Sequence, residues 1–170
     1  PEILKRDMII YKLNIRSFSM DFVSGRKECG TFKAVMRKIK YLKELGITSL
    51  LFMPVYEFEE MNIPPKVEIP EYARNKTKAK QKAVENIPET NDKVNMWGYG
   101  DGSYFAVKSS YAYDPQNSAS EFKTLVKKLH ENNMECIMEM HFLDTANHNL
   151  ILEALRFWVK EYHVDGFKLI

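Results

Sequence analysis

The spacing of apolar residues along the chain predicts alternating strands and helices. Four runs rich in β-branched, aromatic and other apolar residues are typical of strands, at 8–16, 47–53, 136–142 and 164–170. Three other segments repeat apolar residues every three or four positions, as one buried helix face does, at 31–45, 118–131 and 150–162. Strands that alternate with helices of this length form βαβ units, so the pattern predicts an α/β fold with a parallel sheet.

Residues at the expected helix ends agree with this pattern. Thr31 can cap the first helix, and Gly46 follows it where a helix often ends in the left-handed conformation. Ser118 and Glu121 have the spacing of a capping box at the start of the second helix. The pair Asn132-Asn133 is expected to end that helix before the third strand.

The stretch between residues 55 and 114 departs from the alternation. Its middle, 74–82, places five positive charges in nine residues with almost nothing apolar, and prolines flank it. No aromatic residue interleaves with these charges, which argues against a single-stranded nucleic-acid site. We interpret residues 62–94 as a solvated, Lys-rich loop insertion within one domain that spans residues 1–170.

Composition narrows the classes of protein. The 170 residues are 45% hydrophobic and 28% charged, which is typical of a globular domain and excludes collagen-like and disordered chains. A net charge of +2 is too balanced to imply nucleic acid or an anionic membrane as partner. No apolar run approaches the roughly 20 residues of a membrane span. Cys29 and Cys136 lie far apart with no C-x-x-C, which fits reduced thiols and a cytoplasmic location.

The common signatures of nucleotide-binding loops, zinc proteases and serine hydrolases are absent from the sequence. It contains no G-x-x-x-x-G-K-S/T, no H-E-x-x-H and no G-x-S-x-G. The four histidines do not share a ligand spacing. We therefore expect no metal and no cofactor.

Aromatic residues near the strand ends are the candidate binding groups. Tyr56 follows the second strand, and Trp97 and Tyr99 lie in a glycine-containing loop before the second half of the chain. Parallel βα folds place their chemistry at the carboxyl ends of strands. Aromatic faces beside carboxylates suit sugar rings, whose C–H faces pack on π-systems. Composition alone favours the alternative that these rings only pack the long loop onto the fold.

The order of several sequence elements resembles the α-amylase superfamily of glycoside hydrolases, in its pullulanase, isoamylase and debranching branch. Residues 8–18 resemble the first barrel strand of that branch, and 41–58 its second strand and following loop. Trp97-Gly98-Tyr99 is similar to an element whose tyrosine stacks on the sugar at the cleavage point. Residues 157–167 resemble the approach to the fourth strand. The resemblance implies a partial (β/α)8 barrel, namely its first four strands and three helices.

The chain departs from the family where the family carries its chemistry. Glu139 stands where the third strand has an aspartate, and Leu143 and Asp144 stand where an Asn-His pair contacts the substrate. On the fourth strand Lys168 replaces the arginine, and Ile170 occupies the position of the nucleophilic aspartate. Isoleucine cannot attack an anomeric carbon, and lysine lacks the two-pronged donor set of arginine. We therefore expect no catalytic residue within this chain.

The resemblance implies a fragment of a glycoside hydrolase that acts on the α-1,4 or α-1,6 bonds of α-glucans and is inactive as given. The alternative is a pseudo-glycosidase barrel that serves as a carbohydrate-binding or protein-interaction scaffold. The expected ligand is an α-glucan or maltooligosaccharide, bound weakly. The candidate substrate-binding residues are Tyr56, Trp97, Tyr99, Glu139, His141 and Asp144.

Two further points stay open at this stage. Glu139 and His141 can equally be inward-facing barrel residues that are held only by hydrogen bonds. The open edges of the first and fourth strands predict self-association, because unpaired strand edges are templates for pairing with another chain.

Overall fold

The computed structural model of the 170-residue chain describes residues 1–19, 28–60, 95–144 and 146–170. The chain divides into two compact units, residues 1–59 with 96–170, and residues 60–95. Every described helix and strand belongs to the first unit. The Lys-rich insertion expected at 62–94 lies outside the described residues.

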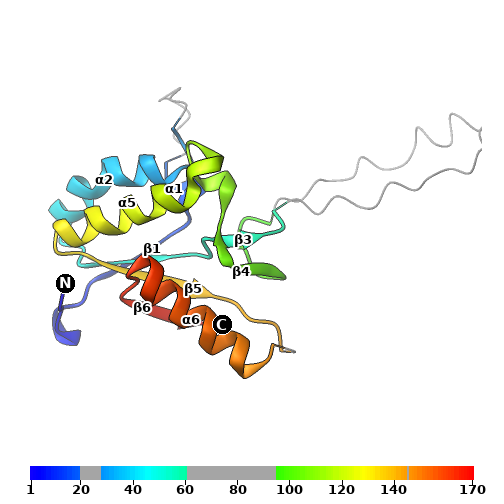
Figure 1. The fold of residues 1–170 in the computed structure, drawn as a ribbon. Helices are drawn as coiled ribbons and strands as arrows, with labels where there is room; N and C mark the ends of the chain where they lie inside the picture. The colour runs from blue at the N-terminus through cyan, green and yellow to red at the C-terminus, as the bar shows by residue number, and fades with distance from the viewer. Residues whose placement is uncertain (20–27, 61–94, 145) are drawn as a thin grey trace, which may run out of the picture. The chain divides into compact units, whose positions relative to one another are not determined.

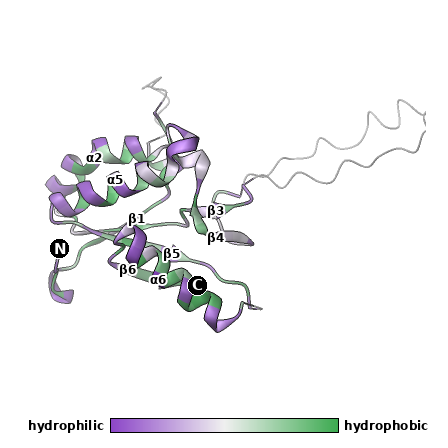
Figure 2. Cartoon of the chain, in the orientation of Figure 1, coloured by the Kyte–Doolittle hydropathy of each residue, from purple (hydrophilic) through white to green (hydrophobic). Residues whose placement is uncertain are grey.

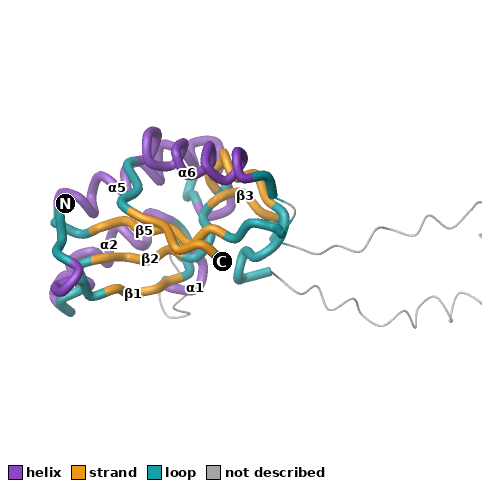
Figure 3. The backbone as a smooth tube through the Cα atoms, turned by 90° about the horizontal axis from the view of Figure 1, so that it is seen from below, coloured by secondary structure: helices purple, strands orange, loops and turns teal. Residues whose placement is uncertain are grey.

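Four parallel strands form the main sheet, as the sequence predicts. The order across the sheet follows the chain, and each strand pairs in parallel with the next. The carboxyl ends of the four strands therefore lie at the same edge of the sheet, and Figure 3 shows three of them side by side. The strands are β1 (Ile10–Leu13), β2 (Ser49–Phe52), β5 (Glu135–Met140) and β6 (Gly166–Leu169).

Helices connect these strands and complete the βα units (Figure 1). The long helices are α2 (Phe32–Glu44), α5 (Ser118–Glu131) and α6 (His148–Tyr162), close to the predicted ranges. A partial (β/α)8 barrel of four strands and three long helices is thus confirmed in the described part of the chain. One-turn segments add α1 (Ile15–Phe18), η1 (Lys5–Asp7), η2 (Ser109–Tyr111) and η3 (Pro115–Asn117).

The first strand is shorter than the sequence predicts, because a helical turn replaces its end. Asn14 caps α1, its Oδ1 atom accepting a hydrogen bond of 3.0 Å from the Ser17 backbone nitrogen. A short polar side chain that binds the backbone three residues on favours such a turn over continued strand. β1 therefore ends at Leu13.

The core lies between the sheet and the helices. Phe52 of β2, Phe122 of α5 and Trp158 of α6 are fully buried and meet edge to face, with ring centroids 6.4 Å and 5.8 Å apart. Trp158 Nε1 donates a hydrogen bond of 2.7 Å to the Tyr104 carbonyl, which satisfies the one polar atom of the indole. In Figure 2 the helices α2 and α5 are each part hydrophobic and part hydrophilic, as helices with one buried face are.

Within residues 55–114 the structure contains a small pair of antiparallel strands that the sequence pattern did not predict. It consists of β3 (Tyr56–Phe58) and β4 (Gly102–Val107). Lys108, only 4% exposed, donates 2.6 Å to Glu57 Oε1 and 2.7 Å to the Phe58 carbonyl. This ion pair between a buried lysine and a partly buried glutamate joins the residue after β4 to β3.

The expected helix caps are only partly correct. Gly46 has φ +80°, so the left-handed end of α2 is confirmed. Thr31 is the N-cap residue of α2, but its hydroxyl donates 2.6 Å to the Glu28 carbonyl and does not cap the helix. A side chain from another helix accepts a hydrogen bond from the first turn of α2 instead.

That side chain is Glu121, so the predicted capping box on α5 is wrong. Asn117, and not Ser118, is the N-cap residue of α5. Glu121 Oε1 accepts 3.2 Å from the backbone nitrogen of Lys33 in the first turn of α2, and both carboxylate oxygens accept 3.1 Å from Tyr113. A buried carboxylate thus serves the electropositive start of a neighbouring helix.

Candidate functional site

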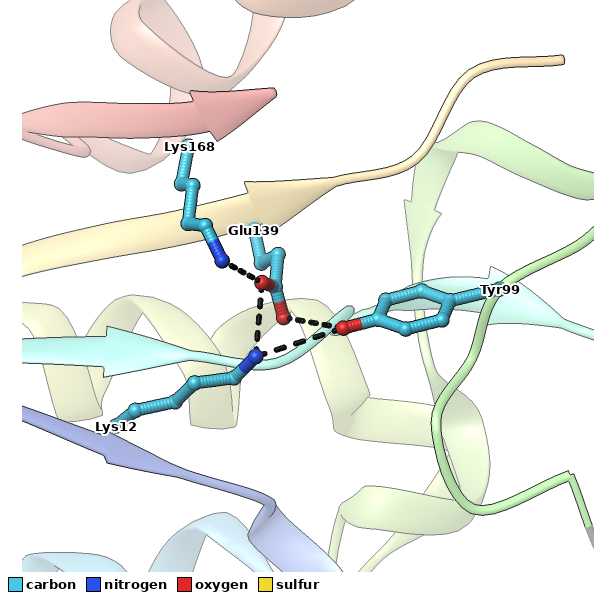
Figure 4. Close-up of polar contacts among 4 residues, drawn as sticks. All are labelled: Lys12, Tyr99, Glu139 and Lys168. Carbon is cyan, nitrogen blue, oxygen red and sulfur yellow. Dashed lines mark hydrogen bonds and ion pairs between the residues drawn. The ribbon is translucent and has the colours of Figure 1, made fainter. Parts of the chain in front are cut away.

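Glu139 occupies the centre of the site, near the carboxyl end of β5. Its neighbours Met138 and Met140 are buried in the core with the helices, so strand alternation places Glu139 on the opposite, inner face of the sheet. Lys168 of β6 lies directly across the strand pair from Glu139, and Lys12 reaches it from β1. Figure 4 shows both lysines and Tyr99 converging on the carboxylate.

Both oxygens of the Glu139 carboxylate are engaged. Lys12 Nζ lies 2.9 Å and Lys168 Nζ 2.8 Å from Oε1. The Tyr99 hydroxyl donates 3.0 Å to Oε2, and Lys12 Nζ lies 3.4 Å from the same hydroxyl. These short charge-assisted contacts fix the carboxylate in one orientation.

The electrostatics of this cluster favour its charged form. Burial alone would raise the pKa of the Glu139 carboxyl, but the hydrogen bonds from Lys168, Lys12 and Tyr99 outweigh burial and lower that pKa below its ordinary value. The hydrogen bond to Glu139 raises the pKa of Lys12 above its ordinary value. At neutral pH the cluster therefore holds one negative and two positive charges.

Three stacked rings lie next to Glu139, and the middle one, Tyr99, donates a hydrogen bond to it. The Trp97 and Tyr99 rings lie 6.3 Å apart with an angle of 27° between their planes. Tyr99 stacks in turn on His141, 5.5 Å away and again at 27°. Trp97 is 62% exposed. We call Trp97, Tyr99 and His141 the aromatic stack; it joins the exposed indole of Trp97 to the tyrosine that donates to Glu139.

The backbone around Gly98 holds the aromatic stack in place. Gly98 has φ +73°, and an added Cβ would lie 2.8 Å from the Phe58 ring and 2.9 Å from Pro54 Cβ. Asn14 Nδ2 donates 2.8 Å to the Met96 carbonyl just before the stack. Only glycine combines this left-handed conformation with so close an approach.

The structure brings four of the six candidate binding residues together, namely Trp97, Tyr99, Glu139 and His141. His141 Nδ1 is buried and has no hydrogen-bond partner among the residues that the structure describes. Asp144 is exposed in the segment after β5 and takes no part in the contacts that join the other four.

Tyr56 has a different role from the one expected. Its ring is fully buried, and its hydroxyl lies 3.3 Å from the Gly98 carbonyl and 3.2 Å from the His141 carbonyl. Burial raises the pKa of its hydroxyl above the ordinary value. No face of the ring is open to a sugar, so the expectation that Tyr56 contacts a ligand is wrong; the residue supports the aromatic stack from below.

Sequence reasoning missed Lys12. The available signal was alternation within β1, where Leu13 is buried in the core and Lys12 must therefore face the other side of the sheet. A charged residue on the inner face of a barrel strand requires a partner of opposite charge. That partner is Glu139.

The two fourth-strand residues that the resemblance singles out, Lys168 and Ile170, lie in β6 and directly after it. Ile170 follows β6, is 48% exposed, and its backbone nitrogen donates 3.0 Å to the Met140 carbonyl. Lys168, which the resemblance places at the position of the family's arginine, forms an ion pair with Glu139. In the part of the chain that the structure describes, no group of three or more His, Cys, Asp or Glu side chains is placed to hold a metal ion. Among the same residues, no helix is both long and apolar enough to cross a membrane.

Parallel strands joined by helices, with a polar cluster and a ring stack at the carboxyl ends of the strands, define a (β/α)8-barrel protein with its site in the usual place for that class. The model of the family "Alpha amylase, catalytic domain" matches residues 16–150. The chain belongs to this α-amylase family, and its similarities lie in the pullulanase and isoamylase branch.

Two relatives show the extent of the match. Isoamylase 3, chloroplastic, of Oryza sativa subsp. japonica is 27% identical over 221 residues, which cover 99% of this chain and 26% of the relative. Pullulanase A of Streptococcus pneumoniae serotype 4 is 26% identical over 207 residues, which cover 96% of this chain and 15% of the relative. The chain thus spans about a quarter or less of the length of these relatives.

Solved structures show the same fold. The pullulanase of Paenibacillus barengoltzii in complex with maltohexaose and alpha-cyclodextrin matches with a TM-score of 0.71 at 22% identity, over 99% of this chain and 31% of that chain. The catalytic module of the glycogen-degrading pneumococcal virulence factor SpuA, in complex with an inhibitor, matches with a TM-score of 0.71 at 23% identity, over 98% and 28%.

Proposed function

We propose that this chain is the sugar-contacting, catalytically silent part of an α-glucan-handling protein of the α-amylase family. Family membership supports the α-glucan class of ligand, and related solved structures hold maltohexaose and maltotetraose. The observation that carries the proposal is the Glu139 carboxylate, which is fully buried and ion-paired with two lysines next to an aromatic stack whose Trp97 ring is exposed.

Catalytic silence follows from what Glu139 is bonded to. A retaining glycosidase needs a carboxylate that can reach the anomeric carbon, and a second carboxyl that protonates the leaving group. Glu139 has neither oxygen available, because the two lysines hold Oε1 and Tyr99 holds Oε2. Ile170, at the position that resembles the family's nucleophile, offers no lone pair.

Sugar contact follows from the aromatic stack. The exposed face of Trp97 can cover the C–H face of a glucose unit, and its stacking on Tyr99 keeps the indole from rotating away. The ammonium groups of Lys12 and Lys168 lie next to the stack and can donate to sugar hydroxyls. An α-glucan chain that lies across Trp97 therefore meets both an apolar face and hydrogen-bond donors.

A second function has the same observation in its favour. A barrel whose inward-facing carboxylate is ion-paired with two lysines can serve as a pseudo-glycosidase scaffold, which binds carbohydrate or a protein without cleaving it. The two proposed functions differ in the activity of the whole protein. The first requires that the whole protein acts on α-glucans, and the second requires that it only binds its carbohydrate or protein ligand.

The test is calorimetric titration of the chain with maltohexaose. Trp97→Ala removes the open ring face and is expected to weaken binding about tenfold, since a ring contact is worth roughly 1 kcal/mol or more. Phe105→Ala is the matched control, because Phe105 is also exposed (43%) but packs on Phe157 and not on the aromatic stack. Equal losses in both variants, or no binding by the unaltered chain, would contradict the proposal.

Catalysis is tested separately with a nitrophenyl α-maltoside. We expect no release of nitrophenol by the chain. Release that disappears in Glu139→Gln would assign Glu139 a catalytic role and overturn the silent site.

A further inference from the structure

Two adjoining hollows form a groove on the outer surface of the barrel, between the helices α2 and α5, which lie side by side in Figure 1. The larger hollow has a volume of about 360 Å³ and the smaller about 260 Å³, and both are lined by Lys33, Met36 and Thr124. Both helices are described over their whole length. No residue of the sheet or of the aromatic stack lines the groove, so α2, α5 and the segments just before them form it alone.

The larger hollow has an excess of positive charge. Three basic side chains line it, Lys33, Arg37 and Lys128, against the single carboxylate of Glu28, so three positive charges and one negative charge leave +2. Glu28 is ion-paired with Arg37, its Oε2 atom 2.6 Å from Nη2. Most of the positive excess therefore has no partner within the hollow itself.

Arg37 and Lys128 can both bind a further carboxylate. Arginine has five N–H donors, of which the ion pair with Glu28 engages those on Nη2, and lysine has three. The side chain of Arg37 is 53% exposed, and Lys128 is exposed and forms no ion pair with the described residues. The planar guanidinium also matches the two oxygens of a carboxylate.

The smaller hollow, at the start of α5, carries the opposite charge. Two carboxylates line it, those of Asp114 and Glu121. Each already accepts a hydrogen bond from a backbone nitrogen, Glu121 at 3.1 Å from Tyr113 and Asp114 at 3.2 Å from Gln116. An acidic ligand is therefore repelled from this end of the groove and attracted to the larger hollow.

The floor of the groove is apolar. Met36 lines both hollows, is half-buried and packs against the core. Its side chain is flexible and polarizable, so it can adapt to different apolar partners. None of the residues that line the groove is aromatic, which disfavours the stacking of a nucleic-acid base or of a sugar ring. A peptide, in contrast, can present acidic and apolar side chains together.

We propose that the groove between α2 and α5 binds an acidic segment of a partner protein. Asp or Glu side chains of the segment meet Arg37 and Lys128, and a neighbouring apolar side chain lies on Met36. The carboxylates are bound by charge-assisted hydrogen bonds, which are stronger than neutral ones. The inference does not rest on the proposed function, because no residue around Glu139 takes part in it.

The first experiment measures the binding of two dye-labelled peptides of equal length by fluorescence anisotropy. One carries Asp and Glu on both sides of a leucine, and the other carries Asn and Gln at the same places. The acidic peptide should bind about tenfold more tightly, and this preference should shrink as the ionic strength rises. Equal binding of the two peptides would overturn the proposal. So would tighter binding of a single-stranded oligonucleotide with the charge of the acidic peptide.

Charge reversal then locates the binding surface. Arg37→Glu combined with Lys128→Glu should weaken the binding of the acidic peptide about tenfold or more. Lys38→Glu combined with Lys127→Glu is the matched control, because it changes the net charge equally at the neighbouring positions of the same helices, outside the groove. Equal losses in the two double variants would mean that the net charge of the chain attracts the peptide, which would overturn the proposal.

The methyl resonance of Met36 reports on the groove in the unaltered chain, so this reading does not depend on whether a variant folds. During a titration with the acidic peptide, the Met36 resonance should shift, and that of Met138, which is fully buried, should stay. A Met36 resonance that does not move at saturation would overturn the proposal. Maltohexaose should leave the affinity for the peptide unchanged, and competition between the two would equally overturn it.

Discussion

Glu139 carries one methylene group more than the aspartate that the resemblance to the family predicts at this position. Its additional methylene group extends the carboxylate further from the strand, where two lysines from β1 and β6 and a tyrosine from the loop before β4 can all reach it. A buried carboxylate is stable only when paired and hydrogen-bonded. At this position the three partners turn a potential catalytic group into a structural and electrostatic one.

The lowered pKa of Glu139 predicts how stability depends on pH. A carboxyl group whose pKa is lower in the folded than in the unfolded chain stabilises the fold at pH values above the unfolded-state pKa, near 4.5. That contribution is lost as the pH falls through the folded-state pKa. The free energy of unfolding of the unaltered chain should therefore fall more steeply below pH 4.5 than that of Glu139→Gln. Urea denaturation at a series of acidic pH values measures both slopes.

Glu57, whose pKa is also lowered through Lys108 and Ser109 despite its partial burial, contributes to both proteins and cancels in the difference. Glu131→Gln, on an exposed position, is the control and should retain the steep slope. Parallel slopes for the unaltered chain and Glu139→Gln would mean that the ion pairs of Glu139 contribute nothing to folding.

At the scale of elements, α2 and α5 are joined by a polar contact as well as by apolar packing. Glu121 of α5 accepts hydrogen bonds from the backbone nitrogens of Lys33 and Tyr113, although Thr31 stands at the N-cap position of α2. One orphan N–H group in the first turn of α2, that of Lys33, is thus satisfied by a side chain of α5. The start of α2 therefore depends on the docking of α5.

This contact predicts that Glu121→Ala destabilises the chain. Removal of the carboxylate leaves two backbone N–H groups without their acceptor, which should cost about 2 kcal/mol in the free energy of unfolding. Glu131→Ala, an exposed glutamate at the end of the same helix, should cost less than about 0.5 kcal/mol. Chemical denaturation checks both, and similar midpoints for the two variants would contradict this role for Glu121.

The loop before β4 positions the aromatic stack, and Gly98 is its most restricted residue. The Cβ of Gly98→Ala clashes with both Phe58 and Pro54 in addition to the strain at φ +73°, so the stack should shift and maltohexaose binding should weaken about tenfold. Gly100→Ala is the matched control: its φ of +149° is also strained, but nothing lies within 4 Å of the added Cβ. Equal binding by the two variants would show that the close approach at Gly98 does not hold the stack.

Elements with a strong period were predictable and those without one were not. The helices α2 and α5 follow from apolar residues at three- and four-residue spacing, and β2 from an uninterrupted apolar run. The β3–β4 pair was not predicted, because β3 has three residues and its partner lies more than forty residues away. Glu121 was assigned to its own helix because a capping box and a contact with another helix have the same sequence signature.

The site was predictable to a similar extent. Trp97, Tyr99, Glu139 and His141 were identified, although whether they meet depends on the long loop, which no local pattern determines. Tyr56 was misassigned because an aromatic residue at a strand end can point into the core as readily as toward a ligand. Lys12 was missed because alternation in β1 places it on the inner face of the sheet but does not tell which strand supplies its partner.

For the whole molecule, the edges of the sheet are the main feature. In the described part of the chain β1 pairs only with β2, and β6 only with β5. Large apolar side chains are exposed next to these edges, among them Ile10 at 50% and Leu169 at 55%. Unpaired edges with apolar neighbours favour pairing with another chain.

We therefore propose that the 170-residue chain self-associates, and sedimentation velocity at micromolar concentration should show a dimer or a larger species. Leu169→Lys places a charge at the β6 edge and should shift the distribution toward monomer. Leu152→Lys is the control, because Leu152 is also exposed (49%) but lies on α6. A clean monomer for the unaltered chain would contradict the prediction.

We propose that this part of the barrel contacts an α-glucan through Trp97 and does not cleave it. Proton NMR during a titration with maltohexaose tests both parts in one sample, because the chain has two tryptophans, the exposed Trp97 and the buried Trp158. We predict that the Trp97 indole resonance shifts, the Trp158 resonance stays, and no new reducing-end anomeric signals appear. Growth of reducing-end anomeric signals, or a Trp97 resonance that does not shift during the titration, would contradict this proposal.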